Sequence, residues 1–152
     1  MKLYRFSPIS NEKQLLATVR YIVRQNTLLC RKITGKALPI SYVTVFSHFP
    51  AEYRKLKNVC NKLGEIVGEN NGPKFAMNNP IKIGSHKITY LRIRKPDTYR
   101  MHAGCCDLDA DYGTMKAKFS KYKNSRIIKH PDMEMIEFFH PEFDVLAYVV
   151  KK

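Results

Sequence analysis

The sequence has few acidic residues and no long apolar run, and each shortage excludes a class of protein. Only 13 of its 152 residues are aspartate or glutamate, against 27 lysines and arginines, which gives a net charge of +14. No stretch approaches the roughly 20 apolar residues of a membrane-spanning helix. Residues 1–10 lack the apolar core and cleavage site of a secretory signal. We therefore expect a cytoplasmic protein with no membrane partner.

Sequence motifs for catalysis and metal binding are also scarce. The chain has no Gly-rich phosphate loop, no Gly-x-Ser-x-Gly turn and no His-Glu-x-x-His pattern, so nucleotide-triphosphatase and hydrolase functions have no support. The four cysteines are not spaced as a metal knuckle. Cys30 and Cys60 fall at apolar positions of helical patterns, which predicts reduced thiols that pack as small apolar side chains.

The sequence does contain enough apolar residues for a folded core. A hydrophobic content of 44% over this length suits one domain, or two halves that share a core. Residues 3–9 could form a short strand. Apolar residues then recur at helical spacing over residues 15–33, after a possible N-cap at Ser10 or Asn11. These features predict an N-terminal strand and helical arm over residues 1–39.

Beyond the arm, the pattern reads strand, helix and further strands, and it does so twice. In residues 40–97, the strand "ISYVTVFSH" precedes a helix from Pro50, and two or three strands follow with turns that include residues 78–80. In residues 98–152, the strand "MHAGCCD" precedes the helix "DADYGTMKAKFSKY" and three strands. An alignment that places the first residue of "YVTVF" over the histidine of "HAGCC" makes an internal duplication of β-α-β-β-β units plausible.

Several segments resemble the vicinal-oxygen-chelate superfamily, which contains glyoxalases, bleomycin-resistance proteins and ring-cleaving dioxygenases. Those nearest to its YecM-like branch are "ISYVTVFSH", "LGEIVGENNGPKFAMNNPIKIGSHKITYLRI", "HAGCCDLDADY" and "FFHPEF", within residues 40–145. The resemblance implies an α+β glyoxalase-like domain over residues 40–152. Its two β-α-β-β-β units would form a curled mixed sheet with helices on the outer face, and the N-terminal helical arm would be additional.

The resemblance also implies a set of site residues. Metal-using members of the superfamily carry ligands, typically His and Glu, on the first and last strands of each unit. Tyr42, Arg92, His102 and Glu137 match these positions. His102 and Glu137 are therefore the candidate catalytic and metal-binding residues, with one divalent metal ion as the implied cofactor. An arginine at the second position counts against a full metal site, because it is always protonated and offers only donors.

The alternation in "ITYLRIRK" indicates an anion-binding face. Leu91 and Ile93 should face the helices, which places Tyr90, Arg92 and Arg94 on the opposite face, where the cleft would form. Two adjacent guanidiniums bind a carboxylate or phosphate and repel a divalent cation. The alternative is a solvated strand whose arginines form surface salt bridges.

The segment "HAGCCD" is predicted to be a buried strand. His102, Gly104 and Cys106 would share the cleft face, while Ala103 and Cys105 would pack towards the helix. Residues four apart on a strand lie about 13 Å apart, so His102 and Cys106 cannot hold one metal ion. The expected ligand-binding residues are Tyr42, Tyr90, Arg92, Arg94 and Cys106.

Other polar residues near the predicted cleft each keep two roles open. Glu137 alternates with large apolar residues, so its carboxylate needs a partner or has a raised pKa, as suits a general base, unless it is exposed at a sheet edge. His102 is a cleft acid, base or ligand, or else a structural histidine. Asp107 or Asp109 is expected to cap the helix that follows.

A run of cations without acidic residues covers residues 112–131. Counterion release by such a run would favour nucleic acid, and the alternative is a solvated face. Phe119 and Tyr122 fall at helical core spacing, which argues against a base-stacking surface. The cations are Lys116, Lys118, Lys121, Lys123, Arg126 and Lys129.

Three functions follow from these patterns. The favoured one is a glyoxalase-like protein, monomer or homodimer, that binds a small anionic metabolite in the cleft, with or without catalysis. The second is a metal-dependent isomerase, lyase or oxygenase that uses His102 and Glu137. The third is a nucleic-acid-associated basic protein.

Overall fold

The computed structural model describes residues 3–152. Within this range the elements are α1 (Glu12–Thr34), β1 (Ile40–Phe46), α2 (Pro50–Leu63), β2 (Gly64–Glu69), β3 (Pro73–Ile83), β4 (His86–Arg94), β5 (Gly104–Leu108), α3 (Tyr112–Phe119), β6 (Ser125–His130), β7 (Met133–Phe138) and β8 (Val145–Val150). After α1, the order strand, helix and three strands occurs twice.

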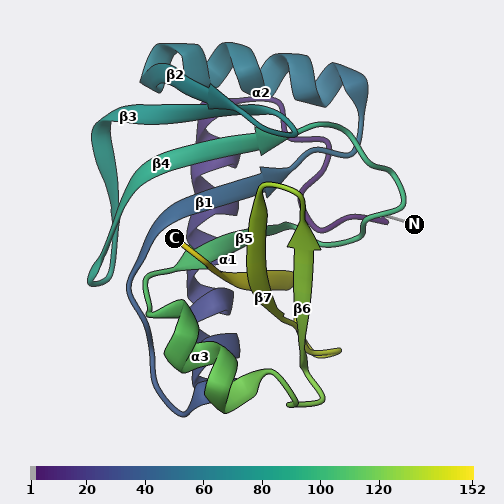
Figure 1. The fold of residues 1–152 in the computed structure, drawn as a ribbon. Helices are drawn as coiled ribbons and strands as arrows, with labels where there is room; N and C mark the ends of the chain where they lie inside the picture. The colour runs from purple at the N-terminus through teal and green to yellow at the C-terminus, as the bar shows by residue number, and fades with distance from the viewer. Residues whose placement is uncertain (1–2) are drawn as a thin grey trace.

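All these strands belong to one mixed sheet in the order β2-β3-β4-β1-β5-β8-β7-β6. Each half has the same arrangement, because β1 is parallel to β4 and β5 is parallel to β8. An antiparallel β1–β5 pair joins the halves. The sheet curls without closing: β1 and β4 lie across Figure 1, whereas the antiparallel pair β6 and β7 stands upright in it. The predicted α+β class and curled mixed sheet are confirmed.

The helices supply a core on one side of the sheet. α1 packs against β1, β5, β7 and β8, α2 against β2, β3 and β4, and α3 against β7 and β8. Buried residues of α1 and α2, such as Leu15 and Leu56, share one apolar cluster with Val43 and Leu91 of the sheet. Figure 1 shows α1 behind the strands, so the N-terminal arm contributes to the same core as the sheet. No helix in residues 3–152 has the length and apolarity needed to cross a bilayer.

The ends of α1 follow the predicted signals. The Asn11 side chain accepts a hydrogen bond from the Gln14 backbone N–H at 2.9 Å. Gly35 ends the helix with φ +83°, a left-handed conformation that favours glycine because it has no Cβ. Asn11, and not Ser10, is therefore the N-cap.

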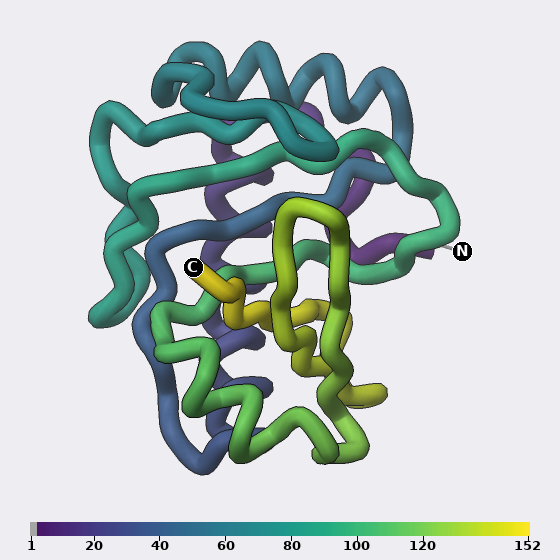
Figure 2. Tube along the Cα trace, viewed as in Figure 1, coloured from purple at the N-terminus to yellow at the C-terminus, as the bar shows by residue number. Residues whose placement is uncertain are grey.

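The strand expected over residues 3–9 does not form. This segment crosses the ends of the central strands, where the Tyr4 hydroxyl donates to the Thr98 carbonyl and the Tyr4 ring stacks on His48 at 3.9 Å. Figure 2 shows the N-terminal chain beside the loop that follows β4. The segment is therefore held by contacts with side chains and a loop, and it does not pair with a strand of the sheet.

Three local expectations are wrong, one in the first unit and two in the second. Residues 78–80 do not form a turn, because β3 continues through them with an irregular pairing to β4 between Ala76 and Ile81. The cap of α3 is Asp111, whose carboxylate accepts from the Thr114 N–H at 2.8 Å, and not Asp107 or Asp109. The helix is also shorter than predicted, because it ends at Phe119.

A candidate ligand-binding cleft

The face of the curled sheet away from the helices forms a cleft of about 1040 Å³. Residues of β1, the β2–β3 turn, β4 and the β4–β5 loop form one side, and residues of β5 to β8 complete it. This volume is at the upper end of the range usual for small-molecule sites, about 300–1,000 Å³. The cleft is therefore large enough for an organic ligand.

The predicted arginine face lies in this cleft. Tyr42, Arg92 and Arg94 line it, and the register pairs Thr44 with Arg92 and Phe46 with Arg94. The Arg94 guanidinium lies 4.6 Å from the centre of the Phe46 ring and 3.9 Å from an Asp97 carboxylate oxygen. Contacts with β1 therefore hold Arg94 over an aromatic ring.

Lys74 is a cleft cation that sequence reasoning missed. Its ammonium lies 4.5 Å from the centre of the Tyr42 ring and 4.4 Å from that of Tyr90, a cation–π arrangement on two strands. Tyr90 holds this cation, although it does not itself line the cleft and is 38% exposed. The alternation around buried Phe75 places Lys74 on the cleft face, and Arg100 of the β4–β5 loop adds a further cation. Only the register of β3 brings Lys74 next to Arg92.

The β2–β3 turn positions the Arg92 guanidinium. Asn71 has φ +55° and Gly72 has φ +117°, where a Cβ would lie 1.9 Å from the Ile93 carbonyl oxygen, so only glycine fits. This turn presents the Asn70 carbonyl, which accepts from Arg92 Nη1 at 3.1 Å. Arg92 Nε is buried and has no hydrogen-bond partner within residues 3–152.

Asp107 lines the cleft and is not a helix cap. It pairs in register with Tyr42 of β1 and Tyr148 of β8. Burial raises the pKa of Asp107 above its usual value, while the positive charges of Arg92, Lys74 and Lys152 limit the rise. Sequence reasoning missed this side chain because it assigned the wrong face to β5.

The face of β5 is the main correction to the predicted site. Gly104 pairs with Val45 and Cys106 pairs with Val43, both on the helix side, and Cys106 belongs to the large core cluster. Cys105 lines the cleft instead. Both cysteines are buried and apolar in character, so the sequence pattern could not show which of them faces the cleft. The alignment with β1 wrongly placed Cys106 there.

Tyr42 lines the cleft as a neutral phenol. Burial is the main cause that raises its pKa to about 12, and the adjacent Arg92 charge opposes that rise. At neutral pH its hydroxyl can donate or accept a hydrogen bond.

Glu137 is a buried carboxylate with hydrogen-bond partners, and it is not exposed at a sheet edge. Its side chain is 2% exposed; one oxygen accepts from Arg126 Nε at 2.7 Å and the other from the Tyr148 hydroxyl at 2.7 Å. Burial and the neighbouring Glu137 carboxylate raise the pKa of Tyr148. The Glu137 carboxylate therefore orients Tyr148 in the cleft wall.

His102 lies before β5 and does not line the cleft, because the strand begins at Gly104. It is half-buried, and burial followed by the Arg100 charge lowers its pKa. The hydrogen bonds and ion pairs of residues 3–152 include no contact between His102 and Glu137. The predicted catalytic pair is therefore not assembled as a contact.

The cleft residues do not fit a divalent metal ion. No group of three or more His, Cys, Asp or Glu side chains within the described range is arranged to hold one. Both Glu137 oxygens are already hydrogen-bonded, and Arg92 and Lys74 would repel a cation. We therefore derive no chemistry through a metal.

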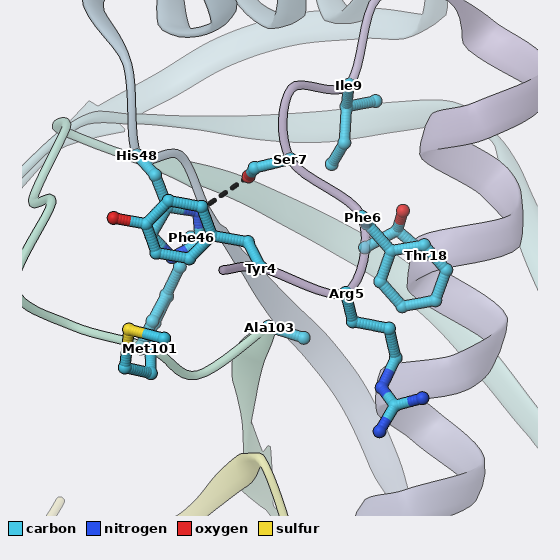
Figure 3. A pocket seen from close by; sticks show the side chains of 10 residues that line it. All are labelled: Tyr4, Arg5, Phe6, Ser7, Ile9, Thr18, Phe46, His48, Met101 and Ala103. Carbon is cyan, nitrogen blue, oxygen red and sulfur yellow. Dashed lines mark hydrogen bonds between the residues drawn. The ribbon is translucent and has the colours of Figure 1, made fainter. Parts of the chain in front are cut away.

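A second, much smaller cavity lies beneath the N-terminal segment and contains a serine–histidine contact. Ser7 Oγ lies 2.6 Å from His48 Nδ1 (Figure 3), and His48 Nε2 lies 3.2 Å from the His102 carbonyl oxygen. The Glu52 carboxylate accepts from the backbone N–H groups of His48 and Ile9, not from the imidazole. The cavity measures about 10 Å³, roughly one water. This contact anchors the N-terminal segment and has no space for a substrate.

The basic run is not a single helical face. Lys116 and Lys129 both bind Glu134, at 3.1 and 3.8 Å, and Arg126 binds Glu137. The Phe119 ring packs edge-on against Phe138 in the core, as predicted, whereas Tyr122 is 41% exposed. The run is divided between α3, a turn and β6, and half of its cations are paired.

Comparisons with known proteins report on the fold. No protein-family model matches the chain, and no curated protein matches its sequence. A solved structure described as Structural Genomics, Protein EC4020 is similar with a TM-score of 0.68 and 11% sequence identity, over 100% of this chain and 92% of that chain. The two proteins therefore share the same fold over almost their full lengths.

Proposed function

We propose that this protein is a divergent glyoxalase-like member of the vicinal-oxygen-chelate superfamily and that it binds a small organic anion in the cleft. The strand–helix–three-strand order of both halves, joined by the β1–β5 pair, supports the family assignment. The cleft lies on the sheet face on which that superfamily binds its ligands, and four cations converge there: Lys74, Arg92, Arg94 and Arg100.

The observation that carries the proposal is the state of the Arg92 guanidinium. Its Nη1 is held by the Asn70 carbonyl, whereas its Nε–H is buried without an acceptor in the described chain. A buried donor left unpaired costs about 1–3 kcal/mol. Once the side chain turns its Nε–Nη2 edge towards the cleft, a carboxylate or phosphate would supply two acceptors in the bidentate geometry that guanidinium favours.

The remaining walls favour an organic anion over an inorganic one. Phe46 and Tyr42 present aromatic rings near the cations, while Met133 and Met135 of β7 line the cleft from the second half. Methionine side chains are flexible and polarisable and adapt to varied apolar shapes. The ligand we propose has an anionic group at Arg92 and an apolar body between these side chains.

The test is anion binding with a charge-matched control. Thermal-shift screening of aryl and alkyl carboxylates and phosphate esters, followed by calorimetric titration, should identify an anion that binds the wild type. Arg92→Gln should weaken that binding at least about tenfold, the loss expected for about 1.4 kcal/mol. Lys118→Gln removes one positive charge from an exposed position of α3, and it should leave the affinity within about twofold of the wild-type value.

Two outcomes would contradict the proposal. One is that no organic anion in the panel raises the melting temperature. The other is that the anions bind wild type and Arg92→Gln equally, which would assign binding to net charge. Both variants should melt within a few degrees of the wild type, because neither side chain forms an ion pair within residues 3–152.

A further inference from the structure

Asp107 is a cleft carboxylate without a partner. It is half-buried on β5, yet its carboxylate takes part in no hydrogen bond or ion pair among residues 3–152. Its register neighbour Tyr148 cannot serve, because the Tyr148 hydroxyl donates to Glu137. Its oxygens are not among the buried unpaired atoms of the described residues, so solvent reaches them, and a ligand that enters the cleft can supply a donor in place of that water.

The cations of the cleft form no ion pair with this carboxylate. The charges of Arg92 and Lys74 act on Asp107 strongly enough to oppose the effect of its burial, although neither forms an ion pair with it. The cleft space is thus lined by Lys74 of β3, Arg92 of β4 and Asp107 of β5, with β1 between β4 and β5. A group that fills this space meets donors on one side and an acceptor on the other.

The charges exclude some anions and favour others. A group that carries two negative charges would place one of them near Asp107, and like charges close together in a partly buried site repel. A single carboxylate at Arg92 with a neighbouring hydroxyl or ammonium group avoids this repulsion. Its donor would pair with Asp107.

We infer that the cleft selects 2-hydroxy or 2-amino carboxylates with an apolar side chain, with Arg92 binding the carboxylate and Asp107 accepting from the 2-substituent. This inference rests on the proposed anion-binding function. It adds a residue that determines specificity and a ligand class, in which the shared chemistry is a donor next to a single carboxylate.

The test uses three probes of nearly equal shape: 3-phenylpropanoate, 3-phenyllactate and phenylalanine. Calorimetric titration of the wild type should give at least about tenfold tighter binding for one of the two substituted acids than for 3-phenylpropanoate, because a hydrogen bond to a charged group is stronger than one between neutral groups. Asp107→Leu should abolish this preference. Asp109→Asn removes a charge from an exposed residue outside the cleft and should retain it.

Asp107→Asn distinguishes the two ligand types. The amide oxygen still accepts from a hydroxyl, so a preference for phenyllactate should persist in part. A preference for phenylalanine should be lost, because the amide carries no charge to attract ammonium. The melting temperatures of the Asp107 variants should be close to that of the wild type, since the side chain has no partner to lose.

The two possible negative results of these titrations have different consequences. Equal binding of all three probes, or a preference that survives in Asp107→Leu, would overturn this inference while leaving anion binding intact. Binding of none of the probes, together with no anion found in the wider panel, would overturn anion binding and this inference with it.

Discussion

Gly104 lies where α1 meets the β1–β5 pair, at the centre of the molecule. A Cβ at this position would lie 2.3 Å from the Thr44 carbonyl oxygen and 2.6 Å from Ile22 Cδ1. The oxygen belongs to a neighbouring strand, so it cannot move without disturbing the ladder. Absence of a side chain here therefore permits the close contact between α1 and the sheet.

Gly104→Ala should destabilise the protein by about 1–3 kcal/mol, the usual range for overpacking. Gly113→Ala is the control: its Cβ would contact only Asp111 Oδ2, at 3.5 Å, and alanine favours a helix, so stability should rise by up to about 1 kcal/mol. Urea unfolding of both variants measures the difference. Equal stability of the two variants would show that the contact at Gly104 relaxes freely.

At the scale of elements, α1 is the longest helix of the described chain and its buried face covers both halves of the sheet. Its first-turn N–H groups need an acceptor, which the Asn11 side chain provides. A helix of this kind gains most of its stability from packing, so loss of the cap should weaken the fold without abolishing it.

Asn11→Ala should lower the free energy of unfolding by about 1 kcal/mol. Asn11→Ser retains an N-cap acceptor and should cost only a few tenths of that amount. Thermal or urea unfolding followed by circular dichroism checks the prediction. If Asn11→Ser were as unstable as Asn11→Ala, the loss of the N-cap hydrogen bond would not be the cause of the destabilisation.

At the scale of the whole molecule, buried histidines make stability depend on pH. Burial lowers the pKa of His48, His86 and His102 below the usual value near 6.5. Below that pH the unfolded chain binds protons that the native chain excludes. The native state is therefore fully stable above about pH 6.5 and loses stability as pH falls towards the lowered values.

The free energy of unfolding should accordingly fall between pH 7 and pH 5. His86→Gln should reduce this slope, because His86 is neutral where its Nδ1 accepts from the Ile40 N–H at 3.2 Å. Urea unfolding at several pH values gives the slope for each protein. An identical slope in the variant would exclude His86 as a contributor.

Periodicity predicted most elements and the arginine face of β4, whereas the family resemblance implied that this face lines a cleft. The β4 strand alternates between large apolar residues and Arg92 or Arg94, so its two faces could be assigned without a partner strand. β5 has adjacent cysteines, and both of its faces are buried, so alternation could not tell Cys105 from Cys106. The error in β5 also hid Asp107.

The sequence by itself determined the α+β class, the order of elements in each half, an N-cap at Ser10 or Asn11, the helix end at Gly35 and the arginine face, because these depend on residues close together in the chain. Only the tertiary structure decided which residues meet across strands. Lys74 lies over Tyr42 and Tyr90, and Arg126 pairs with Glu137, through register and curvature of the sheet. A shift of one residue in register exchanges the two faces of a strand, and no local pattern specifies that shift when both faces are apolar.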